Sequence, residues 1–524
     1  MEASGTKIIP DLLQEKVQLH PDKEFVVFED AKGDVTSLTY REFSERVNRL
    51  TNSLIADGVQ PGQKIALMLA TSPEFLVSWF AINQAGAVMV PVNVFYAADE
   101  LQYLLCSSDS IGFITEPKFV PLFKEVAANC LQVRVKISAR TGDGVSGFRL
   151  LPDILGTESS MCRIARVPPA APAQIVYTSG TTSRPKGAII SHQSSVIQGI
   201  AIAMQFGMTS ADRTCVVLPL FHVNGQYVGV IPTLTVGGTI VLLEAYSAAR
   251  FWSQVRAHQC TLTSIVPMLL RTMLAQPPQA DDAVHKVRFS FYALPTTNDE
   301  WDQFERRFGV RLVEGYGLSE TLGICSCNPV VHGTTKRHSI GLPLLGRQMR
   351  VVDESGKDLP TDEVGRVLVR GEAMFSGYYK NQEATDACMV DGWFDTGDNG
   401  SIDSDGYFHF FDRSKDVIKR AGENIAATEV ERVLNEHPKI SESAVISVPD
   451  PLRDEAVKAF IVLNPGEVMT EEEVREWCAR HLAKFKVPSF CEFRTSLPKT
   501  SIGKIMKYVL KKEERDVVKQ ASSV

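Results

Sequence analysis

A run of hydroxyl-bearing residues is the strongest candidate for chemistry in this sequence. Residues 177–187 read YTSGTTSRPKG, and six of the first seven can offer a hydroxyl group. Gly180 allows a ligand to approach the backbone closely, and Lys186 adds a positive charge after the stiff Pro185. Hydroxyls, free backbone N–H groups and one lysine are what a polyphosphate needs. The loop is not a Walker A motif, since G-x-x-x-x-G-K-[ST] is absent, and a polar surface loop is the alternative interpretation.

A second segment combines an aromatic ring with a carboxylate. In GYGLSE, residues 315–320, two glycines flank Tyr316, whose ring could lie on the face of a purine. Glu320 is an oxygen ligand suited to Mg²⁺, which typically needs only one or two carboxylates in addition to substrate phosphates. A turn at the end of a strand is the alternative interpretation.

Three further polar segments follow toward the C-terminus. In WFDTGD, residues 393–398, Asp398 could accept hydrogen bonds from a ribose diol, although an Asx turn better explains an isolated D-T-G-D. Residues 412–425, DRSKDVIKRAGENI, have too few apolar positions for a core helix. Residues 498–504, PKTSIGK, place a lysine after a glycine in a polar loop.

The elements that must position these segments follow a strand–helix–strand pattern in the first 320 or so residues. The spacing of apolar residues predicts a buried strand at 64–69, a helix at 72–85 and a second strand at 88–92. The pattern recurs at 214–244 and at 261–295. We therefore expect α/β architecture with largely parallel sheets.

The sequence pattern changes twice after these 320 or so residues. Beyond residue 340, short strands alternate with Gly, Asp and Pro turns, which predicts an antiparallel, barrel-like piece. From residue 412 onward, Thr428 with Glu431 and Thr470 with Glu473 fit capping boxes that open two helices of a small α+β domain.

This organisation predicts one large and one small domain. The large N-terminal domain of α/β subdomains with the barrel-like piece spans residues 1–412, and a hinge spans residues 413–415. A mobile α+β lid domain spans residues 416–524.

Composition excludes several classes of protein. The 524 residues include 55 basic and 62 acidic side chains, so the net charge of −7 argues against a general nucleic-acid binder. Ten cysteines form no C-x-x-C, and we expect reduced thiols in a cytoplasmic protein. The first residues do not resemble a signal peptide. The uncharged stretches 75–98 and 214–243 are interrupted by Pro, Gly and Asn, so we expect buried elements there and no membrane span.

In this order and spacing, the five polar segments resemble the adenylate-forming superfamily, which comprises acyl-CoA synthetases, carrier-linked adenylation domains and beetle luciferase. The resemblance covers nearly the whole chain. Several stretches are similar in particular to bacterial crotonobetaine/carnitine–CoA ligases: TSGTTSRPKG, AARFWSQV, QPPQADD, ERRFGVRL, RDEAVKAFIVLN and AKFKVP.

The resemblance implies a set of ATP-binding residues. Those around the phosphates would be Thr178, Ser179, Gly180, Thr181, Thr182 and Lys186, with Tyr316 stacked on adenine and Asp398 and Arg413 at the ribose. Glu320 would hold Mg²⁺.

The resemblance also implies residues for the two half-reactions. Lys504 would meet the carboxylate and the α-phosphate during adenylation, and Lys415 lies at the hinge position. The loop that faces the active site during thioester formation would carry Lys419, Gly422 and the cofactor-binding Asn424. His222, in the pocket-lining candidate FHVNGQYVGV at residues 221–230, is a further candidate catalytic residue.

The implied activity is that of an ATP-dependent acyl-CoA ligase. A carboxylate attacks the α-phosphorus of ATP, which gives an acyl-adenylate and pyrophosphate, and the thiol of CoA then displaces AMP. The carboxylate and ATP are both anionic, so Lys504 and Mg²⁺ must screen the repulsion between them. The alternatives are a stand-alone enzyme that loads the thiol of a carrier protein, and a non-catalytic adenylate-binding protein.

Two features of the sequence concern the acid. Residues 292–295, Tyr-Ala-Leu-Pro, replace a Gly/Ala-rich stretch that usually borders the adenine and acyl pocket in the superfamily. Residues 221–230 contain no Asp or Glu, whereas a trimethylammonium acid would favour a carboxylate or an aromatic cage, for which Phe221 and Tyr227 are the only aromatic candidates in this segment. The subfamily resemblance therefore suggests carnitine-like acids, while the local chemistry favours an uncharged, medium-sized acid.

Overall fold

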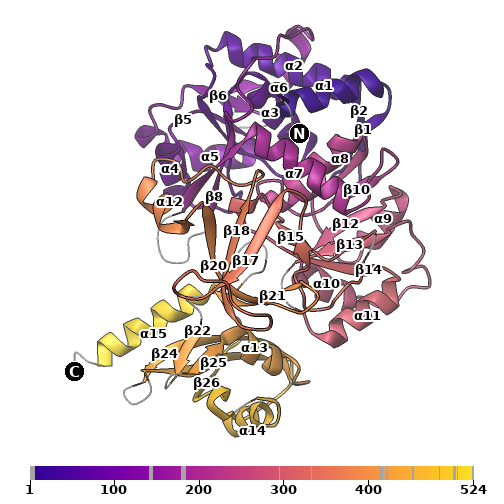
Figure 1. The fold of residues 1–524 in the computed structure, drawn as a ribbon. Coiled ribbons are helices and arrows are strands. Elements are labelled where there is room, and N and C mark those ends of the chain that lie inside the picture. The colour runs from indigo at the N-terminus through magenta and orange to yellow at the C-terminus, as the bar shows by residue number, and fades with distance from the viewer. Residues whose placement is uncertain are drawn as a thin grey trace.

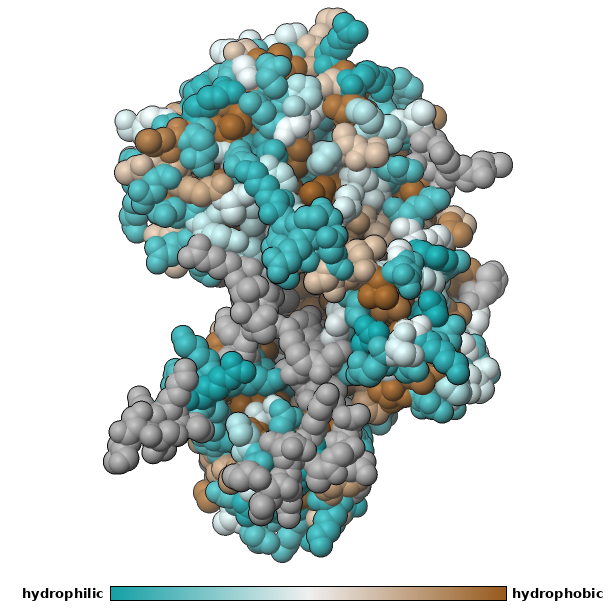
Figure 2. Space-filling view, turned by 60° about the vertical axis from the view of Figure 1, so that its left-hand side comes forward, coloured by the Kyte–Doolittle hydropathy of each residue, from teal (hydrophilic) through white to brown (hydrophobic). Residues whose placement is uncertain are grey.

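The computed structural model describes residues 6–140, 145–178, 185–293, 296–331, 333–413, 417–420, 423–450, 454–482, 484–499, 503 and 505–521. Figure 1 shows a large body that holds most of the chain, with a smaller C-terminal unit below it. Within these described ranges, no helix is long and apolar enough to cross a membrane. On the face drawn in Figure 2, hydrophobic residues form separate patches among many hydrophilic ones.

A seven-stranded sheet forms one part of the large body, in the order β7-β6-β5-β3-β4-β8-β9. All its pairs are parallel except β8 with β9. Its strands are β3 (Lys64–Met68), β4 (Val88–Pro91), β5 (Ser110–Thr115), β6 (Val135–Ser138), β7 (Arg149–Leu150), β8 (Pro172–Thr178) and β9 (Lys186–Ser191). The helices of this part are α1 (Ile9–Leu19), α2 (Tyr40–Ala56), α3 (Pro73–Gln84), α4 (Ala98–Ser107), η1 (Pro117–Phe119), α5 (Val120–Val126), η2 (Ala127–Asn129), α6 (Leu151–Thr157) and α7 (His192–Gln205).

A nine-stranded sheet forms the second part, in the order β16-β15-β14-β13-β12-β10-β11-β1-β2. The strands from β1 to β14 along this order pair in parallel, which confirms the predicted sheet type. Its strands are β1 (Glu24–Glu29), β2 (Val35–Thr39), β10 (Arg213–Val216), β11 (Thr239–Leu243), β12 (Leu262–Ile265), β13 (Phe289–Tyr292), β14 (Arg311–Tyr316), β15 (Ser326–Cys327) and β16 (Leu342–Pro343). Its helices are η3 (Asn224–Val230), α8 (Ile231–Val236), α9 (Phe251–Ala257), α10 (Pro267–Leu274), α11 (Asn298–Phe308) and η4 (Ser319–Thr321).

One hydrophobic core connects the two sheets through α1, α2, α3, α7 and α8. Successive residues of β3 point to opposite faces of their sheet. Ile65 and Leu67 therefore join this central core, whereas Ala66 and Met68 join a second core that includes residues of α4 and α5. Helix α4 thus covers the face of the seven-stranded sheet that is turned away from the nine-stranded one.

The predicted barrel-like piece is an antiparallel sheet of five strands. Its elements are β17 (Arg347–Val352), β18 (Gly365–Gly371), α12 (Gln382–Cys388), β19 (Met389–Val390), β20 (Trp393–Ile402) and β21 (Phe408–Arg413). The sheet ends at Arg413, and the next strand begins at Val417. The predicted hinge, with Lys415, falls between them and lies mostly outside the described residues.

The C-terminal unit is the predicted α+β arrangement. Its elements are β22 (Val417–Arg420), β23 (Glu423–Ala426), α13 (Ala427–Asn435), β24 (Ile440–Asp450), β25 (Asp454–Leu463), α14 (Glu471–His481), η5 (Lys484–Lys486), β26 (Phe490–Phe493) and α15 (Lys507–Ala521). Thr470 and Glu473 form the predicted capping box of α14. The other predicted box is wrong, because α13 already begins at Ala427 and the Thr428 hydroxyl donates to the carbonyl of Phe411.

Candidate active site

A two-stranded ladder holds both ends of the hydroxyl-rich loop. Thr178, the last residue of β8, pairs with Lys186, the first residue of β9. The Thr178 hydroxyl donates to the Lys186 carbonyl at 3.4 Å. The loop between them, residues 179–184, contains the predicted Ser179, Gly180, Thr181 and Thr182 and lies outside the described residues.

The segment 375–379 runs along β9 like an added strand. The Tyr379 N–H donates to the Gly187 carbonyl at 2.8 Å, and the Ile189 N–H donates to the Gly377 carbonyl at 3.0 Å. This pairing brings Tyr378 next to the end of the loop, with the Lys186 ammonium 5.2 Å from the centre of the Tyr378 ring.

Glu320 lies at the same place, on η4, and is only 8% exposed. Its carboxylate accepts a hydrogen bond of 2.7 Å from the Tyr378 hydroxyl, and its carbonyl accepts one of 2.8 Å from the Phe375 N–H. Burial and the charge of Glu320 raise the pKa of Tyr378, so this hydroxyl stays protonated. Lys186, Tyr378 and Glu320 therefore form a continuous series of cation, ring and carboxylate beside the loop.

This donor set fits Mg²⁺ bound together with phosphates. Such a site needs one or two carboxylates, with substrate oxygens as further ligands. Among the described residues, no group of three or more His, Cys, Asp or Glu side chains is placed to hold a metal ion. Glu320 remains the carboxylate predicted to hold an ion at the loop.

Tyr316 and Asp398, predicted for adenine and ribose, lie in direct contact. The Tyr316 hydroxyl donates to Asp398 Oδ2 at 2.5 Å, and Asp398 is 2% exposed. Burial and the Asp398 charge raise the pKa of Tyr316 well above its ordinary value, so it remains a donor. Arg413 pairs with Asp398 across β20 and β21. Asp398 thus contacts Tyr316 through its side chain and Arg413 through strand pairing.

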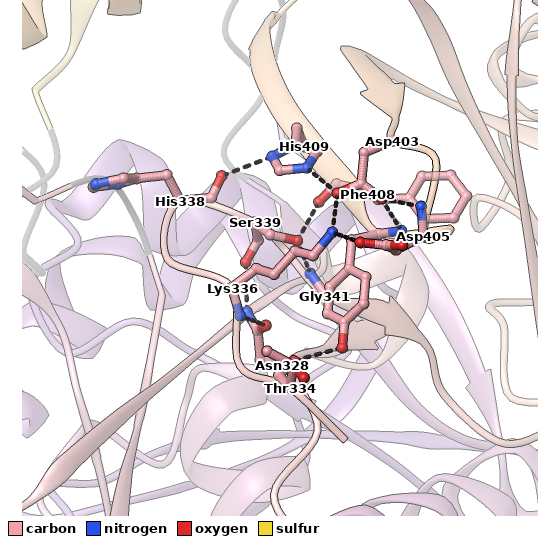
Figure 3. Close-up of polar contacts among 11 residues, drawn as sticks. Asn328, Thr334, Lys336, His338, Ser339, Gly341, Asp403, Asp405, Phe408 and His409 are labelled. Carbon is pink, nitrogen blue, oxygen red and sulfur yellow. Dashed lines mark hydrogen bonds and ion pairs between the residues drawn. The ribbon is translucent and has the colours of Figure 1, made fainter. Parts of the chain in front are cut away.

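A polar network anchors the hairpin that carries Asp398 (Figure 3). The Lys336 ammonium donates to Asp403 at 2.7 Å and to Asp405 at 2.6 Å, and His409 Nε2 lies 3.1 Å from Asp403. Burial raises the pKa of Asp403, but the hydrogen bonds from Lys336 and His409 outweigh it and hold that pKa well below its ordinary value. The network ties the β20–β21 turn to the segment between β15 and β16.

We expect the Lys336→Met variant to be less stable than the parent protein at pH 7, with a smaller difference at pH 3. The Asp403 carboxyl has a depressed pKa in the folded state, so its stabilising contribution is complete above the unfolded pKa of about 3.9 and is lost as the pH falls through the folded value. Urea unfolding midpoints at the two pH values measure this. An undiminished difference at pH 3, or an equal loss in the control Lys32→Met, would contradict the assignment.

Residues 221–230 are built differently from a cage for a cation. Tyr227 is 0% exposed, and its hydroxyl lies 2.6 Å from Gln174 Nε2 and 2.9 Å from Ser195 Oγ. It is therefore part of the core, which corrects its interpretation as an aromatic candidate for the pocket. Phe221 is also buried, but its ring lies 6.4 Å from that of Phe95, which is 67% exposed.

His222 follows Phe221, with their ring centres 4.5 Å apart. Burial lowers the pKa of His222 to about 4, so the imidazole is neutral at pH 7. Its buried Nε2 atom has no hydrogen-bond partner among the described residues. A neutral imidazole with one unused nitrogen can bind a polar group of a substrate, but it carries no charge with which to attract one.

A small cavity of about 10 Å³, enough for one water molecule, lies beside η3. Among its described lining residues, none is charged, and the polar ones include Thr214, Asn224, Thr263 and Ser264. Gly229 lets η3 pack closely against β10, since a Cβ atom there would lie 2.6 Å from a methyl of Val216.

The residues predicted for the thioester step and the predicted adenylation lysine, Lys504, belong to the C-terminal unit. Lys419, on β22, pairs with Asn424, on β23. Gly422 and Lys504 lie outside the described residues. Their neighbour Gly503 is described, and a Cβ atom built on it would lie 3.2 Å from Met268 Cβ on α10 of the large body. Gly503 therefore lies close to the large body.

Three positioning residues were missed by the sequence analysis. Tyr378 orients Glu320, as described above. Two residues of α4 hold the ends of the hydroxyl-rich loop: the Tyr103 hydroxyl donates to the Pro185 carbonyl at 3.0 Å, and Ser107 Oγ lies 2.8 Å from the Tyr177 hydroxyl. No sequence signal could have revealed them, because each contact joins segments that are far apart in the chain.

Comparison with known families adds an independent observation. The sequence profile of the AMP-binding enzyme matches residues 13–379, and that of the AMP-binding enzyme C-terminal domain matches residues 429–504. The chain belongs to the AMP-binding enzyme family. The first match covers the hydroxyl-rich loop and Glu320. The second match ends at Lys504 but begins after Lys419.

Relatives within the AMP-binding enzyme family span the whole chain. The crotonobetaine/carnitine–CoA ligase of Salmonella agona (strain SL483) is 37% identical over 525 residues, which is 98% of this chain and 100% of that protein. The anthranilate CoA ligase AuaEII in complex with anthranoyl-AMP has a TM-score of 0.89 at 27% identity and covers 99% of this chain and 98% of its own. ATP-bound MatB from Rhodopseudomonas palustris has a TM-score of 0.87 at 28% identity, with 97% and 99% covered.

These findings confirm the predicted α/β adenylate-forming fold and the predicted similarity to crotonobetaine/carnitine–CoA ligases. They also confirm the predicted class of activity, an ATP-dependent acyl-CoA ligase of the AMP-forming acid–thiol type. ATP and CoA are accordingly consistent with the family as substrates. The alternative of a carrier-protein partner finds no support in these relatives.

Proposed function

We propose that this ligase activates an uncharged, medium-sized carboxylic acid and transfers it to CoA. The observation that carries the proposal is the uncharged wall around residues 221–230. His222 is neutral at pH 7, Tyr227 is bonded within the core, and the described residues around the adjacent cavity carry no charge. A trimethylammonium group would lose its hydration in such surroundings without gaining a carboxylate or an aromatic cage.

The proposal assigns a role to each predicted site residue. Thr178, Ser179, Gly180, Thr181, Thr182 and Lys186 bind the phosphates of ATP, Tyr316, Asp398 and Arg413 bind its nucleoside, and Asn424 contributes to cofactor binding. Tyr378 orients Glu320 through the hydrogen bond of 2.7 Å. When Mg²⁺ is bound at Glu320, it supplies charge screening for the phosphates. His222 binds the carboxyl group of the acid, and Lys504 holds that group near the α-phosphate.

The C-terminal unit, residues 416–524, is proposed to rotate about the hinge 413–415 relative to residues 1–412. Lys504 serves the first half-reaction and Lys419 the second. The proximity of Gly503 to Met268 supports a state in which the Lys504 segment lies against the large body. A cytoplasmic location is also part of the proposal, supported by ten free cysteines, which are typical of a reducing compartment.

A panel of acids tests the substrate class. We expect octanoate or benzoate to exceed L-carnitine and crotonobetaine in kcat/KM by about tenfold or more, because burying the unpaired cation costs more than about 1.4 kcal/mol. Pyrophosphate release in the presence of ATP, Mg²⁺ and free CoA is the measurement. A clear preference for carnitine or crotonobetaine would show that the pocket argument is wrong.

A further inference from the structure

Two thiols lie in contact on the outer side of the seven-stranded sheet. The sulfur atoms of Cys106 and Cys130 are 3.8 Å apart, and both are free cysteines. Cys106 lies in the last turn of α4 and is exposed, whereas Cys130 follows η2 and is 1% exposed. One thiol is thus open to a reagent from solution, and the other is its buried neighbour.

The same turn of α4 supports the ends of the hydroxyl-rich loop. Tyr103 and Ser107, which hold Pro185 and Tyr177, lie within three residues of Cys106. The rings of Tyr103 and Tyr177 also pack edge to face with centres 6.4 Å apart. Residues three apart on a helix lie on neighbouring positions of its surface, so a displacement at Cys106 reaches Tyr103 directly.

We propose that Cys106 and Cys130 form a reversible disulfide in the presence of a peroxide, and that this disulfide weakens the use of ATP. The second part rests on the proposed role of residues 178–186 in binding phosphates. The bond would act by displacing α4 from the loop that it supports.

The chemistry of the step balances with hydrogen peroxide as the oxidant. The exposed Cys106 sulfur, as thiolate, attacks one peroxide oxygen and breaks the O–O bond, which gives a sulfenic acid and, after protonation, water. Cys130 then attacks the Cys106 sulfur, the S–OH bond breaks, and the hydroxide leaves with the Cys130 proton as a second water. Burial and the neighbouring Cys106 raise the pKa of Cys130 to about 12, so Cys106 reacts with the peroxide first and Cys130 resolves the intermediate.

The geometry explains why the bond would reach the loop. Two sulfurs at 3.8 Å are in van der Waals contact and must approach further to share a bond. Rotation of the two Cys side chains and movement of the last turn of α4 or of the segment at Cys130 share this approach, and any movement of α4 reaches the loop. The hydrogen bonds at Tyr103 and Ser107, of 3.0 and 2.8 Å, weaken steeply with changes in distance and angle.

The experiment treats the full-length protein with hydrogen peroxide, blocks remaining thiols and analyses peptides without reduction. We expect a crosslinked peptide that joins Cys106 to Cys130. In acid-dependent ATP–pyrophosphate exchange, we expect the KM for ATP to rise about fivefold, as for the loss of one ordinary hydrogen bond, and to return after treatment with dithiothreitol.

Matched variants separate this pair from other cysteines. In Cys106→Ser, the same peroxide treatment should leave the KM for ATP unchanged. This result would exclude oxidation of Cys388, which interacts electrostatically with Glu320 and Lys186, as the cause of the effect. Tyr103→Phe should raise the KM for ATP in the reduced protein, because it removes one contact between α4 and the loop.

Each failure has a distinct meaning. Absence of the crosslinked peptide would overturn the disulfide, and a crosslinked protein with an unchanged KM for ATP would overturn its effect on the loop. Absence of exchange in the untreated protein would instead count against the proposed function, since detection of the crosslinked peptide needs no activity.

Discussion

Replacing Lys504 by alanine is expected to lower acyl-adenylate formation by about 10³-fold and to leave its conversion to the thioester nearly unchanged. The first step brings a carboxylate against the phosphates of ATP, so the loss of a positive charge at the reacting atoms costs on the order of 10²–10³-fold in rate. Gly503, directly before this lysine, lies close to Met268 of the large body, since a Cβ atom built on it would be 3.2 Å from Met268 Cβ. Acid-dependent ATP–pyrophosphate exchange measures the first step, and synthetic acyl-adenylate with CoA measures the second.

The Lys419→Ala variant should show the reverse pattern. Lys419 lies 85 positions before Lys504 (504 − 419), on β22, where it pairs with Asn424 of β23. One site beside Thr178 and Lys186 cannot easily hold both lysines at once. Rotation of the C-terminal unit would exchange them and let the thiol enter after pyrophosphate has left.

The Lys415→Pro variant tests the rotation itself. Proline fixes φ near −65°, so this change at the predicted hinge should retain the adenylation step and lose the thioester step. The exposed Lys512 of α15 supplies a control, since Lys512→Ala should retain both steps. Equal loss of both half-reactions in the Lys504 and Lys419 variants would favour a single rigid site.

The parts of the fold that could be predicted depend on contacts between residues close together in the sequence. Ser72 caps α3 by accepting from the N–H of Phe75, and Thr470 and Glu473 cap α14, so the local sequence determines where both helices begin. Thr428 fits the same pattern but lies inside α13, because its hydroxyl bonds to Phe411 of the preceding sheet. A tertiary partner thus overrides the local signal.

The same distinction applies to the candidate site. Lys186 and Glu320 stand in recognisable motifs, whereas Tyr378 comes to them only through the pairing of its segment with β9. Tyr227 has the residue type of a pocket wall, but its bonds to Gln174 and Ser195 place it in the core. Spacing along the chain cannot show such partners, because Ser195 lies 32 residues from Tyr227 and Glu320 lies 58 residues from Tyr378.

Replacing Glu320 by glutamine is expected to lower the adenylation rate by about 100-fold, which corresponds to about 2.7 kcal/mol of transition-state stabilisation. Glu320 is 8% exposed, and its side chain lies beside Tyr378 at the end of the predicted phosphate-binding loop. Glutamine keeps the shape and an oxygen that can accept from the Tyr378 hydroxyl, so the change removes mainly the negative charge. The amide oxygen is a weaker ligand for Mg²⁺ than a carboxylate.

A role in metal binding and a role in packing differ in their dependence on Mg²⁺. If Glu320 holds the ion, the Glu320→Gln variant should need a higher Mg²⁺ concentration for half-maximal ATP–pyrophosphate exchange. Tyr378→Phe is the matched control, because it removes the hydrogen bond of 2.7 Å but leaves the carboxylate. That control should lose less activity than Glu320→Gln, and its Mg²⁺ requirement should rise less, because the carboxylate remains but is no longer oriented by Tyr378. Loss of activity in Glu320→Gln with an unchanged Mg²⁺ requirement would instead show that the carboxylate acts by fixing Tyr378.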